Sequence, residues 1–173
     1  MEKYIPDIYQ KSIYTIDYKK LADRGIKCLL FDLDNTLVPS SIKKSNKKLR
    51  ELFKELKEKD FDIYIFSNSH KARVKIFADD LGVKYYASAK KPFKRNLLKL
   101  LYENEYNESE VAIIGDQILT DILVGNLVGI TTVLVNPISH KDFILTRFNR
   151  ILERQIIKKL RKYDLFALGK YYD

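Results

Sequence analysis

The sequence has few of the residues that stabilise a small protein covalently. It contains a single cysteine, Cys28, among 173 residues. One thiol excludes an internal disulfide and a structural zinc site built on cysteines. We expect Cys28 to be a core residue of a protein in a reducing compartment, because free cysteine is among the most buried residue types. The N-terminal residues lack the apolar run of a signal peptide.

Long hydrophobic runs and an excess of acidic residues are also missing. The weakly polar stretch 118–138 is interrupted by Asp121, Asn126 and Gly129, so it lacks the ~18 consecutive apolar residues of a membrane-spanning helix. Basic residues outnumber acidic residues by 32 to 23, which gives a net charge of +9. This excess favours an anionic partner, either nucleic acid, an acidic lipid surface or a phosphorylated substrate. A lysine-rich proteome would give the same balance.

The sequence does contain an alternation of apolar runs and segments of helical period. Strands are expected at 27–33, 61–66, 83–86, 111–114 and 131–135, and helices at 44–59, 71–81, 92–104, 117–128 and 141–162. Repeated strand–helix units predict an α/β fold, a single Rossmann-like domain of three layers with a parallel sheet in the middle. The expected division is an N-terminal docking arm at 1–26, a catalytic core at 27–139, and a basic amphipathic helix and tail at 140–173.

Polar residues follow four of the expected strands, where ligands bind in open parallel sheets. These stretches are D-L-D-N-T from Asp32, S-N-S from Ser67, A-K-K-P ending at Pro92 and G-D-Q-I-L-T-D from Gly115. Each alone has a simpler explanation, since S-N-S caps a helix and K-P starts one. Four such stretches in succession form a far more specific signal.

The first stretch raises an electrostatic question. Asp32 and Asp34 place two carboxylates at the end of a buried strand, where like charges repel and raise each other's pKa. A metal ion or a reacting phosphate group would offset that cost. Mg²⁺ suits such a site, because it is a hard cation that one or two carboxylates, water and phosphate oxygens can satisfy.

The four motifs, in this order, resemble those of the haloacid dehalogenase (HAD) superfamily of phosphohydrolases. The stretches P-D-I-Y-Q-K-S-I-Y near the N-terminus and T-R-F-N-R near the C-terminus resemble the subclass IIIA proteins called YqeG-type, which include the phosphatidylglycerophosphate phosphatases of the mitochondrial type. The resemblance spans about Pro6 to Lys162. Only 34 residues separate Asp32 from Ser67, and 23 separate Ser67 from Lys91, so we expect no cap domain over the site.

The resemblance implies a Mg²⁺-dependent phosphomonoester hydrolase that acts through an aspartyl phosphate. It implies that Asp32 is the nucleophile and that Asp34 is the general acid and base. Ser67, Asn68 and Lys91 would bind the phosphate group. The lysine is taken as Lys91 because the family's lysine directly precedes the proline.

The resemblance also implies a metal site. Asp32 and Asp116 would be direct ligands of Mg²⁺, and Asp34 would contribute its main-chain carbonyl. Asp121 would either lie behind these ligands or bind the ion through water, and Thr36 is expected to hold the motif loop by a hydrogen bond.

Segment 140–162 carries eight basic and two acidic residues, and therefore +6 of the net charge of +9. Apolar residues recur in it at intervals of three and four, namely Leu145, Phe148, Leu152, Ile156 and Leu160. Either this stripe packs on the domain while the charges face water, or the helix binds an anionic membrane. Five residues of the tail could add interfacial contacts, namely Tyr163, Phe166, Leu168, Tyr171 and Tyr172. The expected location is the cytoplasm, with peripheral attachment to the inner face of the membrane.

The resemblance favours phosphatidylglycerophosphate as the substrate and phosphatidylglycerol as the product. Two alternatives stay open. A phosphatase of nucleotides or nucleic-acid ends would also suit the basic charge, although no aromatic stacking platform is clearly placed for it. The other alternative is a non-catalytic module that binds nucleic acid or ribosomes and has lost the activity of the site. All the motif residues needed for catalysis are present, which disfavours this alternative.

Overall fold

The computed structural model describes residues 1–139 and 144–173, with the backbone alone for residues 144–147. Residues 140–143, where the last helix was expected to begin, lie outside the described residues. In chain order the elements are η1 (Glu2–Tyr4), β1 (Ile8–Gln10), α1 (Tyr18–Asp23), β2 (Cys28–Phe31), α2 (Lys47–Glu58), β3 (Asp62–Phe66), α3 (Lys71–Leu81), β4 (Lys84–Tyr86), α4 (Arg95–Glu103), η2 (Glu108–Glu110), β5 (Val111–Gly115), η3 (Ile118–Ile122), α5 (Leu123–Val128), β6 (Thr131–Val135) and α6 (Ile144–Lys162).

The strands form one six-stranded sheet in the order β1-β6-β5-β2-β3-β4. All of its neighbouring pairs are parallel, which confirms the predicted α/β fold. Strand order reverses between β2 and β5, and such a switch point opens a crevice at the carboxyl ends of the strands. All five expected strands are present. The sixth, β1, lies within the expected docking arm and pairs with β6.

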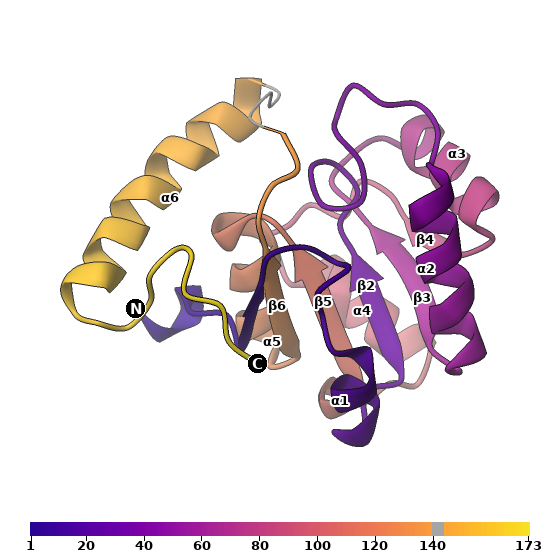
Figure 1. Cartoon of the computed structure of the whole chain (residues 1–173), viewed down its shortest axis with the longest axis horizontal. Coiled ribbons are helices and arrows are strands. Elements are labelled where there is room, and N and C mark those ends of the chain that lie inside the picture. The colour runs from indigo at the N-terminus through magenta and orange to yellow at the C-terminus, as the bar shows by residue number, and fades with distance from the viewer. Residues whose placement is uncertain (140–143) are drawn as a thin grey trace.

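Helices cover both faces of the sheet (Figure 1). Side chains alternate along a strand, so Leu29 and Phe31 of β2 pack in the core cluster that holds α2 and α3, whereas Leu30 packs in the cluster that holds α4 and α5. Because both faces are covered, the strands are continuously apolar rather than alternating. Cys28 is fully buried, and burial raises the pKa of its thiol to about 12, as expected of an inert core cysteine.

Three helices differ from the expected ranges. The helix expected over 92–104 is α4, which begins only at Arg95. The helix expected from residue 44 begins at Lys47, because the Asn46 side chain caps it by accepting the Leu49 N–H at 2.8 Å. The helix expected over 117–128 is divided into the wide turn η3 and the helix α5. The division matters for the site, since η3 carries Asp121.

The C-terminal tail closes the sheet edge formed by β1. Tyr9 and Tyr172 exchange main-chain hydrogen bonds of 2.8 and 2.9 Å, and the Tyr9 ring lies 5.3 Å from that of Phe166, centroid to centroid. Phe166 is only 4% exposed. The expectation that Phe166 adds to an interfacial surface is therefore wrong, because its ring fills the core beside β1.

The apolar stripe of α6 is split between core and surface. Leu160 is fully buried and Ile156 partly buried, whereas Phe148 and Leu152 are exposed. The side chain of Leu145 lies outside the described residues, and Ile151, which is not part of the stripe, is also exposed.

In Figure 1, α6 lies on the β6 side of the sheet, with its first turns above the carboxyl ends of the strands. Near its other end, Leu160 packs in a core cluster with Leu134 of β6. Among the described residues, none of the helices has both the length and the apolar character needed to cross a bilayer.

If the tail is part of the fold, Phe166→Ala should lower the free energy of unfolding by about 3 kcal/mol, because it removes a buried aromatic ring. The matched control is Tyr163→Ala, whose side chain is exposed and should change stability by no more than about 0.5 kcal/mol. Urea denaturation followed by circular dichroism measures both. Equal stability of the two variants would contradict the packing of the tail.

Candidate active site

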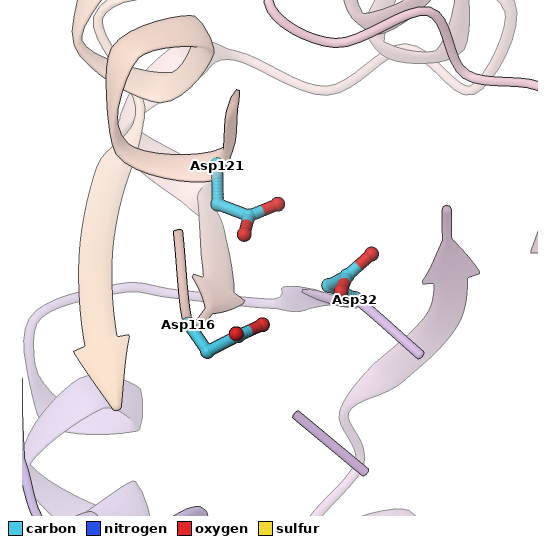
Figure 2. Close-up of side chains that lie close together, drawn as sticks. All are labelled: Asp32, Asp116 and Asp121. Carbon is cyan, nitrogen blue, oxygen red and sulfur yellow. The ribbon is translucent and has the colours of Figure 1, made fainter. Parts of the chain in front are cut away.

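Three aspartates converge at the carboxyl ends of the central strands. Asp32 follows β2, Asp116 follows β5, and Asp121 lies in η3. One oxygen from each carboxylate lies within 4.8 Å of the others, and Figure 2 shows the three side chains pointing into a common space. All three residues are buried. The structure therefore brings together three of the carboxylates that the sequence motifs singled out.

The backbone explains how Asp121 reaches this position. The carbonyl of Gln117 accepts hydrogen bonds from the N–H groups of both Asp121 and Ile122, at 3.0 and 3.3 Å. The N–H of Gln117 in turn donates to Asp121 Oδ2 at 3.1 Å. A Cβ atom on Gly115 would lie 2.2 Å from the Asp121 carboxylate. Only glycine at position 115 leaves room for this carboxylate beside β5.

Lys91 supplies the buried positive charge of the cluster. Its Nζ donates to Asp32 Oδ1 at 2.8 Å, to Asp121 Oδ1 at 2.6 Å and to the carbonyl of Phe66 at 2.9 Å. All three donors of the ammonium group are therefore used. The neighbouring Lys90 is exposed, so of the two candidate lysines it is Lys91 that lies in the site.

The S-N-S stretch after β3 frames this lysine. Asn68 Oδ1 accepts the Lys91 N–H at 2.7 Å, and Asn68 Nδ2 donates to the Lys91 carbonyl at 3.0 Å. Ser67 is buried, and its Oγ accepts the N–H of Ser69 at 3.1 Å. The side chain of Asn68 thus holds the backbone of Lys91, while its predicted phosphate contact through the main-chain amide stays a prediction.

Asp34 is held apart from the three buried carboxylates. Arg73 of α3 donates to Asp34 Oδ1 from Nε at 2.9 Å and from Nη2 at 2.7 Å, and the Ser69 hydroxyl donates to Oδ2. Sequence reasoning did not single out Arg73 or Ser69. A signal was available, because Ser69 belongs to S-N-S and Arg73 lies in the first turn of the helix that follows it.

Asp116 is held from two sides. Thr36 Oγ1 donates to Asp116 Oδ1 at 2.8 Å, so Thr36 reaches across the site instead of only closing its own loop. That loop is closed by main-chain bonds, including the Asn35 N–H to the Val38 carbonyl at 2.7 Å. On the other side, Arg150 of α6 donates to Asp116 Oδ2 and to the Asp116 carbonyl. Sequence reasoning counted Arg150 among the basic charges of segment 140–162 and quoted it as the last residue of T-R-F-N-R, but gave it no role in the site.

The electrostatics of the cluster follow from its burial. Burial raises the pKa of Asp32 to about 8; Lys91 opposes this shift and the charges of Asp121 and Asp116 add to it. Burial likewise raises the pKa of Asp116 to about 6 against the opposing charge of Arg150. Burial alone would lower the pKa of Lys91, but Asp121 and Asp32 outweigh it and raise that pKa above its ordinary value. The carboxylates repel one another and offer hard oxygen donors, which is the donor set that Mg²⁺ prefers.

A cleft of about 640 Å³ opens above the cluster. Its walls consist of residues from the strand ends and from α6, namely Asp32, Asp34, Ser67, Asn68, Ser69, Lys91, Pro92, Gln117, Leu119, Thr120, Leu123, Phe148 and Asn149. Within the described residues, the segments between β2 and α2 and between β3 and α3 carry no cap domain. Neither of these two segments therefore covers the cleft.

Comparisons with known proteins show what the chain is similar to. Residues 1–139 match the family model described as mitochondrial PGP phosphatase. The chain is 38% identical over 159 residues to the probable phosphatase YqeG of Bacillus subtilis (strain 168), and the match covers 92% of each chain. It is 29% identical over 176 residues to phosphatidylglycerophosphate phosphatase 1, chloroplastic/mitochondrial, of Arabidopsis thaliana, with 91% of this chain and 49% of that protein covered.

A solved structure supports the fold. The cobalt-bound form of the deoxy-D-mannose-octulosonate 8-phosphate phosphatase from Haemophilus influenzae superposes with a TM-score of 0.51 at 18% identity. The superposition covers 82% of this chain and 94% of that chain. At this identity the likeness concerns the fold alone.

The position of Lys91 predicts a large effect on stability. Lys91→Met leaves two buried carboxylates without their shared cation, so the free energy of unfolding at neutral pH should fall by about 3 kcal/mol. Lys90→Met removes the same charge from the neighbouring exposed position and should be nearly neutral. Urea denaturation of both variants in EDTA measures the difference. An unchanged stability of Lys91→Met would contradict the buried ion pairs.

Proposed function

This chain belongs to the mitochondrial PGP phosphatase family and is a phosphatase of the HAD type, and we propose that its substrate is phosphatidylglycerophosphate and its product phosphatidylglycerol. The observation that carries the proposal is the buried cluster of Asp32, Asp116 and Asp121 with Lys91, of which Asp32 and Lys91 line an open cleft. The plant relative, named for this lipid substrate, supports the choice of lipid.

We assign Mg²⁺ as the cofactor. Asp32 and Asp116 would bind it through their carboxylates and Asp34 through its main-chain carbonyl, with Asp121 beside them. The three clustered carboxylates fit this role, since they provide the hard oxygen ligands that Mg²⁺ takes. When bound, the ion neutralises charge between the phosphate and the carboxylates.

The carboxylate of Asp32 attacks phosphorus, which forms a bond from its oxygen to phosphorus while the bond to the glycerol oxygen breaks. Asp34 donates a proton to the departing alkoxide. In the second step water attacks the phosphorus of the aspartyl phosphate, its proton passes to Asp34, and inorganic phosphate and free Asp32 are regenerated. Arg73 and Ser69 hold the Asp34 side chain for both transfers.

Phosphoryl transfer depends mainly on positioning and charge compensation, because the protein has little covalent help to give. Lys91 already contacts Asp32, so its ammonium lies where negative charge accumulates on the transferring group. Ser67 and the main-chain amide of Asn68 would bind two further phosphate oxygens, at the start of α3.

The exposed end of α6 suits a substrate that stays in a membrane. Phe148, Ile151 and Leu152 are exposed there, and Phe148 also lines the active-site cleft. The segment that contains them carries most of the chain's excess positive charge, and each basic residue near an anionic surface contributes about 1 kcal/mol. We assign this face to an anionic lipid surface, which makes the protein a peripheral one on the cytoplasmic side of the membrane.

The catalytic assignment predicts that Asp32→Asn lowers the rate roughly a thousandfold or more, because an amide cannot serve as the nucleophile. The measurement is phosphate release from phosphatidylglycerophosphate in mixed micelles with Mg²⁺ or EDTA. Asp60→Asn, at an exposed position, is the control and should keep full activity. Mg²⁺-dependent hydrolysis of an aryl phosphate without activity on the lipid would retain the mechanism and contradict the lipid substrate.

The membrane assignment predicts that Ile151→Asp weakens binding to vesicles containing phosphatidylglycerol roughly tenfold, because it replaces an inserted apolar side chain by a charge that the anionic surface repels. Ile76→Asp is the matched control, since Ile76 is similarly exposed on α3 and should not change binding. Co-sedimentation with these vesicles and with phosphatidylcholine vesicles measures the effect. Equal binding by both variants would contradict a membrane-facing α6.

A further inference from the structure

Arg150 joins the C-terminal helix to the active site. It lies on α6, beyond the residues that match the family model, and its guanidinium is only 17% exposed. Its Nη1 donates to the Asp116 carbonyl at 2.8 Å and its Nη2 to Asp116 Oδ2. One side chain thus contacts both the main chain and the carboxylate of Asp116.

Arg150 is itself fixed in place. Its Nη1 also donates to Glu153 Oε2 at 3.0 Å, and Glu153 Oε1 accepts the Leu119 N–H at 3.0 Å. Leu119 belongs to η3, the turn that carries Asp121. A buried glutamate is costly unless it is paired, and here it ties α6 to that turn. A continuous chain of hydrogen bonds therefore links Asp116, α6 and η3.

The two oxygens of Asp116 have different donors. Thr36 donates to Oδ1 and Arg150 to Oδ2. Hydrogen-bond donors on both oxygens fix the plane and direction of a carboxylate. When the carboxylate binds a metal ion, these donors orient the oxygen that faces the metal. Thr36 comes from the loop after β2, whereas Arg150 comes from α6. The hydrogen bond to Oδ2 is therefore the contribution of α6 to the orientation of Asp116.

We propose that Arg150 is a positioning residue, supplied by α6, that orients Asp116 for binding of the divalent cation. The proposal rests on the proposed function, in which Asp116 is a metal ligand. It makes α6 a part of the active site as well as a membrane-facing helix.

A competing effect has the opposite sign. The positive charge of Arg150 would repel a cation, so charge alone predicts tighter metal binding when Arg150 is removed. The structure favours orientation as the larger effect, because Glu153 pairs with Arg150 and offsets its charge. The sign of the change in metal affinity therefore separates the two effects.

The test is Mg²⁺ binding to the full chain by isothermal titration calorimetry, with Arg150→Gln, Arg150→Lys and a control. The control is Arg24→Gln, which removes an exposed arginine at the end of α1. The half-saturating Mg²⁺ concentration for hydrolysis of p-nitrophenyl phosphate is measured in parallel, because this soluble substrate removes any effect of membrane binding. Circular dichroism and thermal unfolding establish that each variant is folded.

We expect Arg150→Gln to weaken Mg²⁺ binding by at least tenfold and Arg24→Gln to leave it unchanged. Arg150→Lys keeps the charge but loses the fork of donors, so it should also bind more weakly than the wild type. If Arg150→Lys binds Mg²⁺ with wild-type affinity, or Arg150→Gln binds it more tightly, the positioning role of Arg150 is overturned. The proposed metal site would stand in either case. If the wild-type protein itself binds no Mg²⁺, the proposed metal site and this inference both fail.

Discussion

The ammonium group of Lys91 is shared between Asp32 and Asp121, and the rest of the site depends on this buried cation. A parallel sheet brings the ends of its central strands together, so carboxylates that follow β2 and β5 must meet. Burial opposes their ionisation, as the raised pKa of Asp32 shows. Lys91 reduces the repulsion among the three carboxylates without removing it. The site therefore favours the binding of further positive charge. A divalent cation would supply that charge, and it would also offset the negative charge of a phosphate group bound in the cleft.

The C-terminal helix has two surfaces with different consequences. Its inner surface places Arg150 on Asp116 and Leu160 in the core beside β1. Its outer surface exposes Phe148, Ile151 and Leu152, and Phe148 lines the cleft. A helix that contacts Asp116 on one side and, as proposed, a lipid surface on the other would bring the phosphate of a membrane-bound substrate to the buried aspartates.

Much of the site could be predicted from the sequence, because its residues directly follow strands that periodicity identifies. Asp32, Ser67 and Asp116 are examples, and the choice of Lys91 over Lys90 rested on the resemblance. Arg150 could not be found in this way, since it lies 34 positions from Asp116 and only the docking of α6 brings them together. The short strand β1 was missed because its pairing with β6 and with the tail, rather than its own three residues, stabilises it. Phe166 looked like a surface residue for the same reason.

The central claim is that Asp32 becomes covalently phosphorylated during turnover. The most direct measurement is an acid quench of the Mg²⁺-loaded protein within its first turnover, followed by peptide mass spectrometry. The account predicts a phosphoryl group on the peptide that contains Asp32, lost on treatment with hydroxylamine. Phosphate release with no phosphorylated peptide, or with the phosphoryl group on the peptide that contains Ser67, would contradict it.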